Sequence, residues 1–185
     1  MKILYRSLGL VAVLALSTLI YSCNKVKDAI RINVPTQTVS ADFTIQPVPV
    51  GTQAVAIFQF GVNLDSLIKI QSKDLGINNI KSAKIKSVSL TLTNATASDN
   101  FGAFSACEIG LSSSAKPEYT VVAGIASNAD ANVNPLDIPV TQDLELKDYF
   151  NSTSFTYRLS ATARRATTTE LKGRATIKFD VVAGL

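Results

Sequence analysis

Apolar and polar residues alternate along most of the chain beyond residue 40. In the run KSVSLTLTN, Val88, Leu90 and Leu92 take one set of alternate positions, and serines and threonines take the other. Successive side chains of a β-strand point to opposite faces of its sheet, so this pattern predicts a strand with one buried face. Similar short runs, rich in β-branched and aromatic residues, are 41–47, 105–111, 118–126, 154–163 and 174–182.

These runs also predict which residues form the core, because alternate positions share a face. The residues expected to share one face within their strands are Phe43, Ile45, Cys107, Ile109, Leu111, Tyr119, Val121, Ala123, Ile125, Phe155, Tyr157, Leu159, Ala161, Ala163, Ala175, Ile177, Phe179 and Val181. The run AVAIFQF, residues 54–60, is apolar on both faces, which is typical of a strand buried within a sandwich. Cys107 is expected to be a small buried core residue.

One segment has helical rather than strand spacing. Leu64, Leu67, Ile68 and Leu75 fall near a helical period, Asn63 is suited to the N-cap, and Gly76 is suited to the stop. This segment predicts one short amphipathic helix that crosses between strands. A single helical turn is expected at 146–150.

Seven or eight antiparallel strands with one crossover helix predict an all-β domain, an antiparallel two-sheet sandwich that is immunoglobulin-like in the broad sense. A small lipid-binding barrel is the alternative. We expect the sandwich to occupy residues 41–185, a length that can bury a core without disulfides or metals.

The N-terminus carries the features of a secretory signal. Lys2 and Arg6 precede a 13-residue apolar run, 8–20. A helix of this length reaches about 20 Å, whereas the hydrocarbon core of a bilayer is about 30 Å thick, so a stable span is disfavoured. Residues 1–22 are therefore expected to be a signal peptide.

The run ends in Ile20-Tyr21-Ser22-Cys23, which resembles the lipobox of bacterial lipoproteins: an aliphatic residue, a tolerant position, a small residue and cysteine. The resemblance implies that Cys23 receives a diacylglyceryl group and palmitate-type acyl chains and becomes the mature N-terminus. Several acyl chains would anchor the protein firmly in a membrane. The alternative is an uncleaved signal anchor in which the cysteine is incidental.

Residues 23–40 are polar and are expected to form the lipidated cysteine and a tether. Ile30, Ile32 and Val34 alternate, so the end of this segment could add an edge strand. A lipobox, a short tether and one β-sandwich together resemble small lipoproteins of Bacteroidota. That layout implies a lipid anchor in the cell envelope, at the outer membrane, with the domain facing the periplasm or the cell surface.

Composition excludes several classes of function. Without Lys2 and Arg6, the 18 basic residues fall to 16 against 14 acidic ones, and this small excess does not indicate a nucleic-acid partner. The chain has no histidine, which removes Ser-His-Asp catalysis and most zinc sites. No paired carboxylates, nucleophile elbow or phosphate loop is recognisable, so we expect no enzyme and no cofactor.

Three groups of polar residues are candidate sites. Arg164 and Arg165, expected near a hairpin tip, could join Lys172 and Arg174 in binding an anionic sugar, a lipid headgroup or an acidic partner. The favoured explanation is that charge near a loop keeps strands soluble. The other two groups are less specific. Ser66 lies in Asp65-Ser66-Leu67, which resembles the O-glycan acceptor sequence of Bacteroidota; the alternative is that Asp65 and Ser66 suit the first turn of the expected helix. The Asn/Asp-rich loop 128–137 departs from a calcium loop and is expected to be a turn cluster without metal.

These features favour an envelope-anchored lipoprotein that acts as a non-enzymatic binding or structural module, with an envelope protein or a glycan as its partner. The alternative is a carrier that holds an apolar ligand or lipid between its sheets or under the helix. A carboxylate-dependent hydrolase is less favoured. An apolar cavity of several hundred Å³ would favour the carrier, and a cleft with two facing acids would favour the hydrolase.

Overall fold

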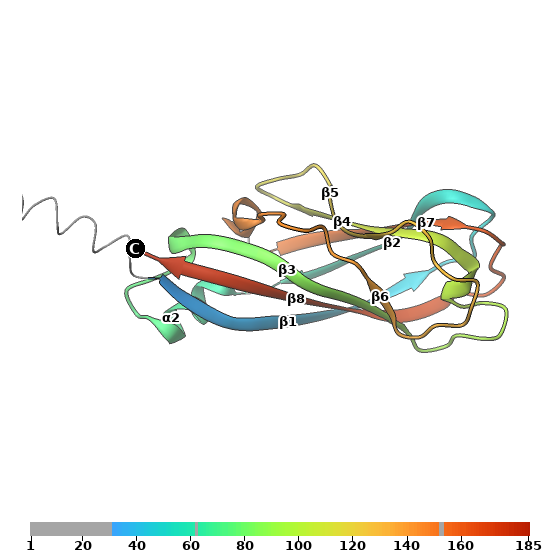
Figure 1. Cartoon of the computed structure of the whole chain (residues 1–185), viewed down its shortest axis with the longest axis horizontal. Helices are drawn as coiled ribbons and strands as arrows, with labels where there is room; N and C mark the ends of the chain where they lie inside the picture. Colours follow the sequence, from blue (N-terminus) through green and yellow to red (C-terminus); the bar gives the residue numbers. More distant parts are fainter. Residues whose placement is uncertain (1–30, 62, 152–153) are drawn as a thin grey trace, which may run out of the picture.

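The computed structural model describes residues 31–61, 63–151 and 154–185, so the signal peptide and Cys23 lie outside the described residues. Eight strands and one α-helix are present in this part of the chain, and the strands form two packed sheets (Figure 1). The elements are β1 (Arg31–Ile45), β2 (Gly51–Gly61), α2 (Leu64–Gln71), η1 (Ile77–Asn79), β3 (Ile80–Leu92), η2 (Phe101–Ala103), β4 (Phe104–Ser113), β5 (Thr120–Ile125), β6 (Leu136–Ile138), η3 (Lys147–Asn151), β7 (Ser154–Ala163) and β8 (Leu171–Gly184).

Both sheets are antiparallel and contain four strands. The first sheet has the order β1-β8-β3-β6, and the second has the order β2-β7-β4-β5. The chain crosses repeatedly from one sheet to the other, which gives the connectivity of a jelly roll, two Greek keys in a double-sheet sandwich. The predicted two-sheet sandwich is confirmed. Its connectivity differs from that of an immunoglobulin domain, and its two separate sheets exclude the barrel.

The central strands follow the predicted alternation closely. In β7, buried and part-buried residues alternate over Phe155–Ala163, and in β8 they alternate over most of the strand. Val88, Leu90 and Leu92 of β3 are also buried, with exposed fractions of 3% or less. Each of these strands has a hydrogen-bonded partner strand on both sides. One face of each strand packs against the core, and the other face is directed toward water.

Aromatic rings fill the space between the sheets. Phe43 of β1 lies 5.8 Å, centroid to centroid, from Phe58 of β2, which in turn lies 5.8 Å from Tyr157 of β7. Further along the sandwich, Phe150 lies 4.9 Å from Phe155 and 5.5 Å from Phe179. Because these contacts join residues of the two sheets, the interior is packed by side chains across its thickness.

The folded domain begins earlier than residue 41. Strand β1 starts at Arg31 and pairs with β8, from Arg31 opposite Gly184 to Ile45 opposite Leu171. Residues 31–40 of the expected tether therefore belong to the edge strand that the alternation of Ile32 and Val34 suggested, and Val34 is buried.

The two-sided burial expected for 54–60 was wrong. Strand β2 is the edge of the second sheet, and Ile57 on its outer face is 63% exposed, whereas Phe58 is buried. A register shift between Ala54 and Ala56 marks a bulge, which adds one apolar residue and breaks the simple alternation. The apolar run 54–60 is therefore buried on only one face of β2.

Helix α2 begins as predicted but ends early. The side chain of Asn63 caps it by accepting a hydrogen bond from the Ser66 amide at 2.9 Å, and the helix ends at Gln71 rather than near Gly76. Gly76 instead allows a close approach, because a Cβ there would lie 2.6 Å from Oδ1 of Asp65. That carboxylate accepts the Ile77 amide at 3.0 Å and ties the following turn to the helix. The turn expected at 146–150 is present as η3.

Candidate binding surface

A hollow of about 570 Å³ lies on the outer face of the first sheet. Its lining consists of Asp42, Phe43, Thr44, Thr91, Thr93, Lys172, Gly173, Arg174 and Thr176. These residues come from β1, β8 and β3 and from the turn after β3. The strand register brings them together: Asp42 of β1 lies opposite Arg174 of β8, which lies opposite Thr91 of β3. We name this site the threonine hollow.

A glycine shapes the floor of the threonine hollow. A Cβ on Gly173 would lie 2.5 Å from Cζ of Phe43 and 2.7 Å from the carbonyl oxygen of Thr91. The buried Phe43 ring can therefore pack directly against the β8 backbone only because residue 173 has no side chain. Sequence reasoning missed this pair, because the contact joins residues 130 positions apart.

The threonine hollow carries more positive than negative charge among its lining residues. Nε of Arg174 donates to Oδ1 of Asp42 at 2.8 Å, and this hydrogen bond and the nearby positive charge lower the pKa of the Asp42 carboxyl. Lys172 lies beside this pair, with its Nζ 3.4 Å from Glu170. Both cations are exposed, as are the side chains of Thr44 and Thr91. The site thus presents cations and hydroxyls to solvent.

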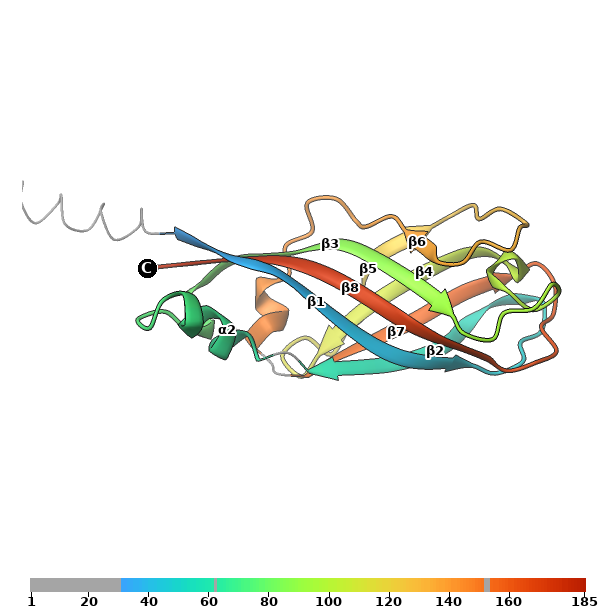
Figure 2. The same cartoon turned by 90° about the horizontal axis from the view of Figure 1, so that it is seen from below.

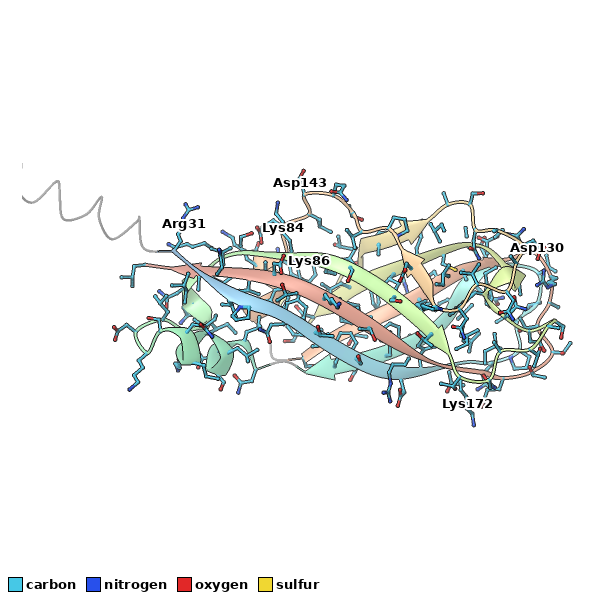
Figure 3. All side chains as sticks on the ribbon, turned by 60° about the horizontal axis from the view of Figure 1, so that its bottom comes forward. Arg31, Lys84, Lys86, Asp130, Asp143 and Lys172 are labelled. Carbon is cyan, nitrogen blue, oxygen red and sulfur yellow. The ribbon has the colours of Figure 1, made fainter. Side chains whose placement is uncertain are left out.

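The threonine hollow lies toward the end of the sandwich opposite Arg31. In Figure 3, Arg31, Lys84 and Lys86 lie toward one end of the molecule, whereas Lys172 and Asp130 lie toward the other. Arg31 is the first described residue. The described part of the chain therefore begins at the end of the sandwich that is remote from Lys172.

Arg164 and Arg165 do not sit at a hairpin tip, so this prediction was wrong. They lie between β7 and β8, which belong to different sheets, and the connection crosses the end of the sandwich. Arg164 donates to the carbonyl of Asn128, while Arg165 pairs with Asp130 and donates to the Ser98 carbonyl at 3.4 Å. These arginines hold neighbouring loops and do not line the threonine hollow, unlike Lys172 and Arg174.

Two side chains of the Asn/Asp loop, those of Asn128 and Asn134, bond separate backbone groups, and Asp130 pairs with Arg165. Asn128 is buried and donates to the carbonyls of Phe101 and Phe104 at 2.9 and 3.0 Å. Asn134 bonds both the amide and the carbonyl of Leu92, at 2.9 and 2.8 Å, and so extends the edge of β3. Asn128 and Asn134 therefore fix the backbone around the loop.

Asp99 is a buried carboxylate that sequence reasoning missed. Only 2% of its surface is exposed, and its oxygens accept hydrogen bonds from the Thr168 amide at 3.1 Å and from the hydroxyls of Thr168 and Thr169 at 2.9 and 2.8 Å. The hydroxyl of Thr169 is the main cause of the lowered pKa of Asp99, and burial opposes it. No local pattern indicates this contact, because Thr168 and Thr169 lie 69 and 70 positions from Asp99.

We expect Asp99→Asn to lower the free energy of unfolding by about 1.5–3 kcal/mol at pH 7, because hydrogen bonds to a charged acceptor are lost. A lowered folded-state pKa stabilises the protein above the unfolded pKa of about 3.9, and the stabilisation is lost as pH falls through the folded value. Urea denaturation at several pH values should therefore show the difference between native protein and variant shrinking below about pH 4. A difference that stays constant down to pH 2 would contradict this role.

The remaining candidates lie on other parts of the molecule. Cys107 is 2% exposed, and burial raises the pKa of its thiol to about 12, so its predicted place in the core is confirmed. Ser66 lies in the first turn of α2 and is exposed to solvent. Cys23 is outside the described residues. Within 31–61, 63–151 and 154–185, helices long and apolar enough to cross a membrane are absent.

The sequence matches no protein-family model and no characterised protein. The structure is similar to the capsid structure of a Helicobacter pylori bacteriophage, with 12% identity, a TM-score of 0.35, and 84% of this chain and 100% of the other covered. It is similar to BFDV capsid protein, with 9% identity, a TM-score of 0.38, and coverage of 84% and 100%. A protein of Parabacteroides distasonis described as secreted shares 9% identity at a TM-score of 0.41, with coverage of 88% and 54%.

Proposed function

We propose that this protein is an envelope-anchored lipoprotein that acts as a non-enzymatic binding module and uses the threonine hollow to bind an anionic, hydroxyl-rich glycan. The threonine hollow is the observation that carries the proposal. Its volume of about 570 Å³ falls within the range of about 300–1,000 Å³ that is common for small-ligand sites.

The lining chemistry suits a sugar acid. Lys172 and Arg174 offer N–H donors to a carboxylate or sulfate group, and hydrogen bonds of this charge-assisted kind are among the stronger ones. The threonine hydroxyls around them can both donate to and accept from sugar hydroxyls. Asp42 pairs with Arg174, and Glu170, outside the lining, lies 3.4 Å from Lys172; exposed ion pairs of this kind are weak, so an anionic ligand can compete for both cations.

The position of the threonine hollow agrees with a lipid anchor at Cys23. Residues 23–30 could extend over at most about 28 Å, at about 3.5 Å per residue. They join the domain at Arg31, at the end opposite Lys172 (Figure 3). An anchored domain would thus carry its binding surface away from the membrane, where a glycan of the envelope can reach it.

The alternatives have less support. The aromatic contacts between the sheets leave the interior packed, which argues against a carrier of an apolar ligand. A hydrolase of the usual glycosidase kind needs two carboxyl groups that flank the scissile bond. The threonine hollow has one carboxylate in its lining, and that carboxylate is hydrogen-bonded to Arg174.

We expect Lys172→Glu to weaken the binding of trigalacturonate by at least about 10-fold, because the substitution replaces an attractive charge with a repulsive one. Isothermal titration calorimetry on residues 24–185 would measure the change, since the described core lies wholly within this part of the chain. Lys178→Glu is the matched control, because Lys178 is an exposed lysine of the same strand that does not line the hollow.

Maltotriose, an uncharged trisaccharide, should bind native protein more weakly than trigalacturonate does. The proposal is contradicted if trigalacturonate fails to bind native protein, or if Lys172→Glu and Lys178→Glu weaken its binding equally.

A further inference from the structure

Strand β2 is a long edge strand without charged residues or proline. Its eleven residues, GTQAVAIFQFG, pair on one side with β7, and β2 ends the order of the second sheet. Among the described residues, no backbone hydrogen bond joins β2 to any strand other than β7. Figure 2 shows β2 along the lower border of its sheet, beside β7. Such an edge is a template for pairing with another strand.

The other three edges carry the protection that β2 lacks. Strand β5 is short, and segment 139–141 covers its outer side: the Gly124 amide donates to the Pro139 carbonyl at 2.8 Å, and the Thr141 amide donates to the Val122 carbonyl at 2.9 Å. Strand β6 has only three residues. Strand β1 contains Pro35 and charged residues at both ends of its run. Proline, charge, short length and covering segments are the usual means of blocking an edge.

Two exposed apolar side chains, Ile57 and Val121, lie on the outer face of the second sheet. Ile57 of β2, Arg158 of β7, Gly110 of β4 and Val121 of β5 form one row across the sheet. Ile57 and Val121, at its two ends, are 63% and 45% exposed. The guanidinium of Arg158 lies 4.2 Å from the centre of the Tyr119 ring. Because Tyr119 directly precedes β5, the Arg158 charge is directed away from β2.

We propose that β2 pairs in antiparallel fashion with β2 of a second copy of this chain, so that two second sheets form one continuous eight-stranded sheet. When a strand pairs with its own copy about a two-fold axis, residue i of one copy lies opposite residue j of the other, and residue j lies opposite residue i. Because β2 has no charged residue, no register of this pairing places like charges opposite each other, and Ile57 would meet apolar or amide side chains. This self-compatibility favours a second copy over a foreign strand.

The size of the contact predicts a weak dimer. Eleven residues of strand extend over about 36 Å, and a strip about 10 Å wide would bury about 700 Å² over both copies. Stable interfaces usually bury about 1,200 Å² or more, so we expect a dissociation constant of about 10–100 µM.

Sedimentation velocity of residues 24–185, from about 5 to 300 µM, tests this dimer. Native protein should shift from monomer to dimer across this range. Ile57→Lys should raise the dissociation constant at least about 10-fold, because it places an ammonium group on the paired edge of each copy near the middle of β2. Gln59→Lys, at another exposed position of the same strand, should act in the same direction.

Val121→Lys is the matched control, because it makes the same kind of change in the same row at the covered edge, and it should leave the dissociation constant within about 2-fold. All three positions are exposed, so the variants are expected to fold, and circular dichroism would check this. A native protein that stays monomeric to 300 µM, or equal effects of Ile57→Lys and Val121→Lys, would overturn the proposal. A monomer would leave the β2 edge to a strand of another protein or to residues outside the described ranges.

Discussion

Replacing Phe179 with alanine is expected to lower the free energy of unfolding by about 3–5 kcal/mol, which is a large part of the stability of an ordinary domain. Phe179 lies on β8, which has partner strands on both sides, and it is 2% exposed. Its ring centre is 5.5 Å from that of Phe150, which joins it to the ring of Phe155. Removing the ring leaves a cavity that neighbouring β-strands can fill only partly.

Urea denaturation of residues 24–185 would measure this loss. Phe179→Leu keeps most of the apolar volume and should cost less than half as much as the alanine variant. Ile70→Ala is the surface control: Ile70 is 72% exposed on α2, and its loss should change stability by no more than about 0.5 kcal/mol. A loss below about 1 kcal/mol for Phe179→Ala would contradict a packed interior and would reopen the carrier hypothesis.

Cys23→Ala is expected to move the protein from the membrane fraction to the soluble fraction almost completely. The reason is chemical, since alanine has no thiol to carry the diacylglyceryl group. Each buried methylene of an acyl chain contributes about 0.8 kcal/mol to membrane binding, so two or three chains anchor a protein that would otherwise dissociate. Fractionation of cells that express native protein and variant, with detection by antibody, would measure the change.

Cys107→Ala is the control for this experiment, because Cys107 is the other cysteine of the chain and is buried in the sandwich. That variant should stay in the membrane fraction. Intact-mass analysis of the native protein extracted from membranes should show the mass of a chain that begins at an acylated Cys23. A Cys23→Ala variant that remains in the membrane, or an unmodified Cys23 in a chain that keeps residues 1–22, would contradict the anchor.

Local periodicity predicted the strands well where a strand lies in the middle of a sheet. In β8, Ala175, Ile177, Phe179 and Val181 are all buried, as their alternate positions indicated. Such strands have the same environment along their whole length, so the sequence period and the burial period coincide.

The same reasoning was less successful at the edges. A bulge adds a residue to a strand and changes which residues share a face. In β5, Tyr119 and Val121 were expected to share the face of Ala123. The register shifts between Val121 and Ala123, so Val121 is exposed while Ala123 is buried. In β2, the apolar run does not reveal that Ile57 faces solvent. Whether a strand is central or at an edge depends on pairing with distant strands, which a single run cannot report.

The candidate site depended even more on distant pairing. Lys172 and Arg174 were recognised as cations in sequence, but their separation from Arg164 and Arg165 follows from the crossing between sheets. Asp42 reaches Arg174 across 132 positions of the chain, and no local pattern indicates this contact. The sequence could therefore supply candidates, whereas the register of β1, β8 and β3 determined which of them share a surface.

An NMR titration of residues 24–185 with trigalacturonate tests the proposed binding site most directly. We expect amide shifts to concentrate at Thr44, Thr91, Lys172 and Arg174 and to saturate, and we expect an equal concentration of maltotriose to produce smaller shifts. Shifts confined to the loops that Arg164 and Arg165 hold together, or no shifts at millimolar trigalacturonate, would contradict the assignment of the threonine hollow as a glycan-binding site.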